Sequence, residues 1–431
     1  MGNKIKMSRN DVDSVSIRIL NDKVRSACEV SFKGCIFRVH DRLRHENSKA
    51  YEPEIVAIGP YHRGKENLQG MEKHKLRYLK KLLERKNESS VARYVVSIKA
   101  MEGRARQSYA ESINLSTDEF VEMLVVDGFF IIELFRKYVL KVHEDLEDPI
   151  FQLFQIQNRI RHDLMLFENQ LPLFILVHLM GMTKEPSPED NIKDLDLAFL
   201  RGTIPCPREL NSSFEMNSVS SHLLELMHKS WFPPLDAVLP NTCTSNKEFE
   251  LIKSTIELRE YGINFEKHVG RTLLDIKFEN GVMKIPPLTV DDFTENVFRN
   301  LIAYEQYLPQ NHRLYVTDYV TFMDRLINSP KDAGKLCHHG IINNWLGDDE
   351  AISSMFNKLG NNVYINPSNF SYSQVFKDVN KHCGRRWNKW LANLRENYFN
   401  TPWTIISFLA AAVLLLLTLT QTIFSVLSYA K

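Results

Sequence analysis

The sequence predicts a mainly α-helical protein, with a large helical body, a small β-hairpin and one C-terminal transmembrane helix. Apolar residues recur at steps of three and four through most of the chain, which is the period of an amphipathic helix. Alternating apolar residues flank a single Asn280-Gly281 pair, which is typical of a tight hairpin turn. The segment 397–430 contains no Asp, Glu, Lys or Arg.

The 431 residues are enough for a large core, and we expect four segments along them. These are an N-terminal segment 1–45, a helical body 46–395, a juxtamembrane segment 396–402 and a transmembrane helix 403–429. The formal net charge of +1 gives no electrostatic reason to expect nucleic acid as a partner. The composition is that of an ordinary globular protein, with 44% hydrophobic and 25% charged residues.

The six cysteines do not indicate a disulfide scaffold or a zinc site. No two of them form a CxxC pair, and reduced thiols in a cytosolic setting are the default for so few cysteines in so long a chain. The first residues lack the apolar stretch of a signal peptide. The chain also lacks the GxSxG, HExxH, GxGxxG and P-loop motifs, so the sequence predicts no metal, no cofactor and no catalytic activity.

Helical periodicity predicts the body element by element. The segment 116–139 opens with Ser116 and Glu119 at the spacing of a capping box. Further amphipathic helices are expected at 171–182, 220–231, 248–262, 291–308, 313–328, 349–359 and 373–396. Polar stretches at 85–90, 183–190, 207–218 and 239–248 are expected to be surface loops.

The β-hairpin is expected within 273–288. Leu274, Ile276 and Phe278 share one face by alternation, and Asn280-Gly281 supplies the two positive φ angles of a type I′ turn. The segment 262–267 is a candidate third strand.

Polar residues embedded in three apolar segments are the main candidates for a site. A buried carboxylate or amide costs about 1–3 kcal/mol if it lacks a hydrogen bond. We therefore expect the helices to satisfy one another's polar groups in a structural network, with Arg299 as the cation. Its predicted members are Asp127, Glu133, Glu168, Asn169, Gln170, Arg299, Asn300, Glu305 and Gln306. The alternative is a membrane-tethered enzyme that uses the carboxylates Asp127, Glu168 and Glu305.

The C-terminal stretch 403–429 is long enough to cross a membrane, since about 20 helical residues span the hydrocarbon core. The other interpretation of this stretch is a buried C-terminal helix. Cations and aromatic residues just before it are suited to an anionic lipid surface, although an ordinary packed helix would also fit them. The predicted membrane-surface residues are Arg385, Arg386, Trp387, Lys389, Trp390 and Trp403.

The distribution of cations predicts the orientation. They cluster before the span and only Lys431 follows it, so the positive-inside rule places the body in the cytosol, at the plasma membrane or an endomembrane. Glycosylation sequons begin at Asn87, Asn114, Asn211 and Asn369, and they would be modified only if the body were lumenal.

Several ordered motifs resemble a plant family called domain of unknown function 247, also known as uncharacterised protein family 0481. The quoted stretches are YEPEIVAIGPYHRGKENLQGMEKHKLRYL (51–79), MLVVDGFFIIELF (123–135), FENQLPLFIL (167–176), IELREYGINF (256–265), LLDIKFENGVMKIPPL (273–288), TENVFRNLIAYEQ (294–306) and LINSPKDAGKLCHHGIINNWLG (326–347), followed by the apolar C-terminus. The resemblance implies a single-pass plant membrane protein without an established catalytic activity. Some grass relatives are linked to self-incompatibility.

These observations lead us to expect a membrane-anchored recognition or scaffold protein that is not an enzyme. Its expected partners are the lipid bilayer and an unidentified protein or peptide, and the oligomeric state is left open.

Overall fold

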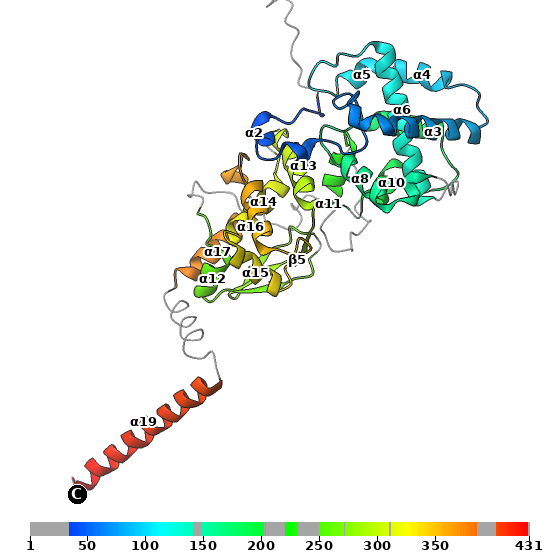
Figure 1. The fold of residues 1–431 in the computed structure, drawn as a ribbon. Helices are drawn as coiled ribbons and strands as arrows, with labels where there is room; N and C mark the ends of the chain where they lie inside the picture. The colour runs from blue at the N-terminus through cyan, green and yellow to red at the C-terminus, as the bar shows by residue number, and fades with distance from the viewer. Residues whose placement is uncertain are drawn as a thin grey trace, which may run out of the picture.

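The computed structural model describes residues 34–140, 148–188, 190–201, 203, 220–231, 250–270, 272–309, 312–385 and 402–429. Helices dominate, as predicted, and strands are few and short. In Figure 1 the helices of residues 69–200 (blue to green) gather on one side of the body and those of residues 255–383 (green to orange) on the other.

The first half of the body is built around α6 (Thr117–Val139), which is buried on nearly every side. Ser116 and Glu119 form the predicted capping box at its start. The helices that pack on α6 are α3 (Gln69–Arg85), α4 (Ala92–Lys99), α5 (Glu102–Arg106), α9 (Leu173–Met182) and α10 (Ile192–Leu200). The other helices of this half are α2 (Asp41–Arg44), α7 (Pro149–Gln152), α8 (Phe154–Leu164) and the 3₁₀ turns η1 (Ser48–Tyr51) and η2 (Glu66–Leu68).

The second half is formed by the later helices of the body. They are α11 (Leu223–Trp231), α12 (Thr255–Glu260), α13 (Thr294–Gln306), α14 (Tyr315–Leu326), α15 (Pro330–His338), α16 (Asp349–Leu359), the 3₁₀ turn η4 (Pro367–Asn369) and α17 (Ser373–Cys383). Every predicted helical segment contains a helix. The helix predicted at 248–262 is shorter than expected, and the segment 386–396 of the last predicted helix lies outside the described residues.

The predicted hairpin is confirmed. β2 (Lys277–Glu279) runs antiparallel to β3 (Val282–Ile285), and the turn residues Asn280 and Gly281 have φ angles of 51° and 81°. β1 (Asn264–Lys267) lies parallel to β3 on its other side, so the sheet order is β1-β3-β2. A second parallel pair, β4 (Leu288–Val290) with β5 (Ile342–Asn344), was not predicted, because its two strands are far apart in sequence.

The last helix, α19 (Pro402–Tyr429), is apolar, and an 18-residue window within Ile406–Tyr429 has a mean hydropathy of 2.1. None of this window is buried by other parts of the protein, whereas a packed core helix would be largely covered. Its length and composition are those of a helix that could cross a membrane.

Candidate functional site

Buried side chains bind the main chain of the segment 54–59, which pairs with no strand among the described residues. The Asp163 carboxylate accepts the N–H groups of Glu54, Ile55 and Val56 at 2.8, 2.9 and 2.8 Å. The Asn169 amide accepts the N–H of Ile58 at 2.6 Å and donates to the carbonyl of Val56 at 3.0 Å. Main-chain groups buried away from water need such partners, so these side chains take the place of a neighbouring strand.

Asp127 extends this set of contacts. Its carboxylate accepts the Gly59 N–H at 2.9 Å and forms an ion pair with Lys75 at 2.6 Å, while Lys75 also donates to the Ala57 carbonyl. Burial raises the pKa of Asp127, and the attraction of the Lys75 ammonium opposes this rise. Gly59 has a φ of +73°, and a Cβ there would lie 2.6 Å from the Gln170 carbonyl oxygen.

Glu168 binds the main chain at Val39 and the side chain of Arg44. Its carboxylate accepts the Val39 N–H at 2.5 Å and pairs with Arg44 at 2.5 Å. The ring nitrogens of the buried His62 lie 3.5 Å from Glu52 and 3.6 Å from Glu168. Burial, together with the nearby cations Lys65 and Arg44, lowers the pKa of His62 to about 3, so its ring is neutral at physiological pH.

Gln170 and Asn300 connect the two halves of the body. The Gln170 amide accepts the Leu224 N–H at 3.1 Å and donates to the carbonyls of Leu164 and Leu166 at 2.7 and 2.9 Å. The Asn300 amide accepts the Phe167 N–H at 2.9 Å and donates to the Ala50 carbonyl at 2.7 Å.

Glu305 caps the start of α14. Its carboxylate accepts the N–H groups of Val316 and Thr317, both at 2.8 Å, and the Thr317 hydroxyl at 2.8 Å. His228 lies 2.7 Å from the same carboxylate. A negative charge at a helix N-terminus is favourable, because free N–H groups and the positive end of the helix dipole meet there. Gln306 faces outward and pairs with the main chain of Tyr364.

Glu133 belongs to a separate group of ion pairs. It binds Arg85 and the fully buried Arg136, and Arg136 also pairs with Asp190 at 2.7 Å and donates to the Thr183 hydroxyl at 3.0 Å. Residues 183–190 were expected to be a surface loop, but Thr183 and Asp190, at its two ends, are buried by this arginine.

The nine predicted network residues therefore do not form one mutually bonded cluster. Arg299 pairs with Glu295 in its own helix and is not the shared cation that we expected. Most of the nine bind main-chain groups of distant segments. These N–H and C=O groups are buried and need hydrogen-bond partners. Asp127, Glu168 and Glu305 are 1%, 1% and 0% exposed, and each is sealed among its own partners.

Sequence reasoning missed Asp163, Lys75 and Arg136, which are central to these contacts. Lys75 could have been found, since it lies four residues from both Met71 and Leu79 on the apolar face of α3. The role of Asp163 has no local signal, because its partners are more than one hundred residues away.

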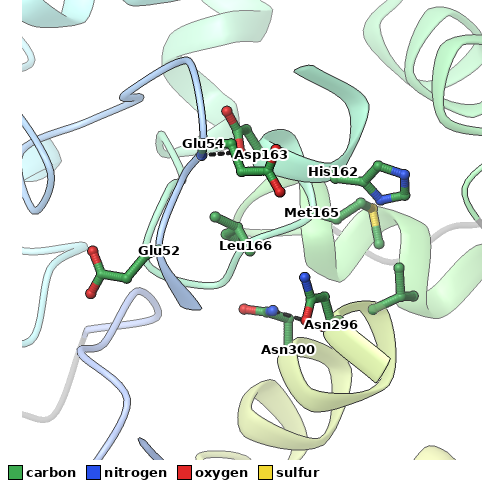
Figure 2. Close-up of a pocket in the computed structure, with 9 residues that line it drawn as sticks. Glu52, Glu54, His162, Asp163, Met165, Leu166, Asn296 and Asn300 are labelled. Atoms are coloured by element: carbon green, nitrogen blue, oxygen red, sulfur yellow. Dashed lines mark hydrogen bonds between the residues drawn. The ribbon is translucent and has the colours of Figure 1, made fainter. Parts of the chain in front are cut away.

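A small pocket opens between residues 52–54, the end of α8 and α13 (Figure 2). Figure 2 shows Asp163 directed at the Glu54 main chain on one side and Asn296 and Asn300 on the other. The space accommodates about one water molecule. The His162 ring stacks on Phe293 at 3.7 Å, and burial lowers its pKa to about 4. Within the described residues, no group of three His, Cys, Asp or Glu side chains is placed to hold a metal ion.

The predicted membrane-surface residues lie mostly outside the described part of the chain. Arg385 is described and exposed, just after α17, and Trp403 is in the first turn of α19. Arg386, Trp387, Lys389 and Trp390 lie outside the described residues.

Comparison with known proteins places these features in a family. A model described as a plant protein of unknown function, domain of unknown function 247, matches residues 36–417. A UPF0481 protein of Arabidopsis thaliana is 30% identical, over 92% of this chain and 87% of its own length. A putative UPF0481 protein of the same plant is 23% identical, over 89% and 88%. No solved structure matches the chain. The family match covers nearly the whole body and extends into α19, and the chain therefore belongs to the plant domain-of-unknown-function 247 family.

Proposed function

We propose that this chain is a membrane-anchored recognition or scaffold protein that acts by binding another protein or peptide. The observation that carries the proposal is α19, an apolar helix whose window Ile406–Tyr429 is long enough to span a bilayer and is not covered by the body. Such a helix in water would expose a large apolar surface, and a bilayer removes that cost.

The state of the buried carboxylates favours binding over catalysis. Asp127, Glu168 and Glu305 are each occupied by main-chain N–H groups and by a cationic or imidazole partner. A general acid or base must reach the substrate, and these three carboxylates are at most 1% exposed.

Exposed aromatic side chains offer the body a contact surface. Trp345 is 76% exposed directly after β5, and its main-chain N–H donates to the Val290 carbonyl at 2.9 Å. The side chain is therefore presented from a fixed backbone. Tryptophan contributes strongly to protein interfaces, because it buries a large area with little loss of conformational freedom. Recognition during self-incompatibility, which the resemblance suggests for some grass relatives, would be one form of such binding.

Two measurements on the full chain test the proposal. The first is alkaline carbonate extraction of plant microsomes: we expect the full chain to stay with the membrane and a chain truncated before Pro402 to be released. Release of the full chain would remove the basis of the anchor.

The second measurement is proximity labelling from the anchored protein. We expect a reproducible set of labelled proteins that Trp345→Ala depletes. Val96→Ala is the matched control, because Val96 is 70% exposed on α4 and is not part of the proposed contact. Equal labelling by wild type, Trp345→Ala and Val96→Ala would contradict the role of Trp345. The non-enzymatic proposal would be contradicted by turnover of a substrate that is lost in a folded Glu168→Gln variant.

A further inference from the structure

Most polar and small side chains in α19 lie on one face, and Ala412 and Thr420 lie outside it. At about 100° of rotation per residue, Ser407, Ala410, Ala411, Leu414, Thr418, Gln421, Thr422, Ser425 and Ser428 fall within an arc of about 120°. Eight of these nine are Ser, Thr, Ala or Gln. The remaining arc of the window is formed by Leu, Ile, Val and Phe, apart from Ala412 and Thr420. A helix that met only lipid would have no reason to separate its side chains in this way.

Gln421 is the costly member of this face. At about 1.5 Å per residue it lies about 12 Å from the end of the helix at Tyr429, which is inside the hydrocarbon core of a bilayer. A primary amide there has two N–H donors and a carbonyl acceptor, and lipid chains can satisfy none of them.

The hydroxyl groups nearby satisfy themselves, unlike the Gln421 amide. Thr418 donates to the Leu414 carbonyl at 2.7 Å, and Thr422 donates to the Thr418 carbonyl at 2.7 Å, both in their own helix. In the described part of the chain, no hydrogen bond to the Gln421 side chain is observed. A polar group of a second polypeptide within the membrane would satisfy this amide.

We propose that α19 associates with α19 of a second copy of this chain, with the Gln421 amides hydrogen-bonded to each other across the interface. An amide both donates and accepts, so two identical helices are complementary at this position without any other partner. The small residues at 407, 410, 411, 418 and 425 let the two backbones approach closely, and the bulky residues remain toward lipid. This inference depends on the membrane anchor of the proposed function.

Cysteine cross-linking of the full chain in microsomes tests the interface. α19 contains no cysteine, and the six native ones lie outside it, so the chain without an introduced cysteine sets the background. Ser425→Cys lies on the polar face and Ile423→Cys on the opposite side. Under a membrane-permeable oxidant, we expect a product of twice the chain mass from Ser425→Cys, and several-fold less of it from Ile423→Cys.

Substitutions of Gln421 in the Ser425→Cys chain test the hydrogen bond. Gln421→Leu should reduce the double-mass product by about three- to thirtyfold, the range for one interhelical polar contact in lipid. Gln421→Asn should retain most of it. Thr420→Leu is the matched control, because it removes a polar side chain on the lipid-facing side that donates within its own helix, and it should leave the yield unchanged.

The outcomes separate this inference from the anchor. Suppose that the chain resists carbonate extraction. Equal yields of the double-mass product from Ile423→Cys and Ser425→Cys would then overturn the self-association and leave the anchor standing. An unchanged yield when Gln421→Leu is added to Ser425→Cys would do the same. A cross-linked product of another mass at 425 also overturns it, in favour of a different membrane helix. Extraction of the wild-type chain by carbonate overturns both proposals.

Discussion

At the residue scale, the buried polar side chains of this protein act mainly on the main chain of other segments. Five main-chain N–H groups within residues 54–59 donate to the side chains of Asp163, Asn169 and Asp127. Each carboxylate or amide costs free energy to bury and recovers it only when its hydrogen bonds form. Removal of one such side chain leaves main-chain donors without acceptors, so the effect on stability should exceed that of a surface hydrogen bond.

Truncation of these residues should destabilise the fold. Glu168→Ala, Gln170→Ala and Glu305→Ala should each lower the free energy of unfolding by about 1–3 kcal/mol. Gln306→Ala is the control: Gln306 bonds the main chain of Tyr364 at the surface, and we expect a change within about 0.5 kcal/mol. Chemical denaturation of the full chain in detergent measures these values. Variants that unfold like wild type but lose binding or turnover would show that the residues serve a function instead.

Asp318 should give the stability a measurable pH dependence. Burial raises its pKa to about 8, helped by the charge of Glu305 and opposed by hydrogen bonds from Ser371 and the charge of Arg313. Because the folded-state pKa lies above the ordinary value of 3.8, the stability that Asp318 contributes is fully present below pH 3.8 and is lost as the pH rises toward 8.

Asp318→Asn keeps an oxygen that can accept from Ser371 but removes the charge. Relative to wild type, this variant should gain about 1–3 kcal/mol of stability when the pH is raised from 5 to 8. The exposed Asp292, changed to Asn, should show no such gain. Thermal unfolding at both pH values measures the difference in stability. If the stability of Asp318→Asn and of wild type changed equally with pH, the pKa of Asp318 would not be raised.

At the element scale, the hairpin shows how a local sequence can determine a turn. Asn280 and Gly281 both have positive φ, which few other residue pairs tolerate, so the turn was predictable without tertiary information. The contact that covers the turn was not predictable. A Cβ on Gly281 would lie 3.0 Å from the ring of His382 in α17, and His382 packs edge-to-face on Phe278.

Gly281→Val should therefore disrupt this element for two reasons, the positive φ and the contact with His382. We expect a loss of at least about 2 kcal/mol of stability and increased proteolysis near the hairpin. Gly103→Ala is the control, because a Cβ there meets nothing within 4 Å and the helix α5 favours alanine. Wild-type stability in Gly281→Val would rule out this account, as would chemical shifts that report helix across 274–285.

At the scale of the whole molecule, the charges on either side of α19 predict an orientation for the body. The cations between Arg385 and Pro402 precede the candidate span in the sequence. If α19 crosses a membrane, the positive-inside rule predicts that the body lies in the cytosol. Two of the four sequons are suitable reporters, since Asn87 and Asn114 are exposed, whereas Asn369 is half-buried and Asn211 lies outside the described residues.

We expect Asn87 and Asn114 to remain unmodified in plant cells, and protease added to intact microsomes to digest the body. The control is a chain with a signal peptide added at its N-terminus, which should acquire glycans at these sites if they are accessible in the lumen. An endoglycosidase-sensitive mass shift of the native chain, lost in Asn87→Gln and Asn114→Gln, would reverse the orientation and favour an outward-facing receptor.

The sequence alone was sufficient wherever the physical cause is local. Periodicity located eight of the described helices, although it did not predict α3, α4, α8, α10 or α15. The Ser116 capping box marked the start of α6, Asn280-Gly281 placed the hairpin, and the charge-free C-terminus identified α19 as a candidate span. Each of these depends on residues within one turn or one window of the chain.

Only the tertiary structure decided which groups satisfy the buried polar residues. Glu168 and Glu305 were recognisable in the sequence as carboxylates within apolar segments. Their partners, however, are the main-chain N–H groups of Val39 and Val316. Every residue except proline has such a group, so the sequence does not indicate which one is the partner. The pairing of β4 with β5 was hidden for the same reason, since a parallel ladder joins main-chain groups of strands that are more than fifty residues apart.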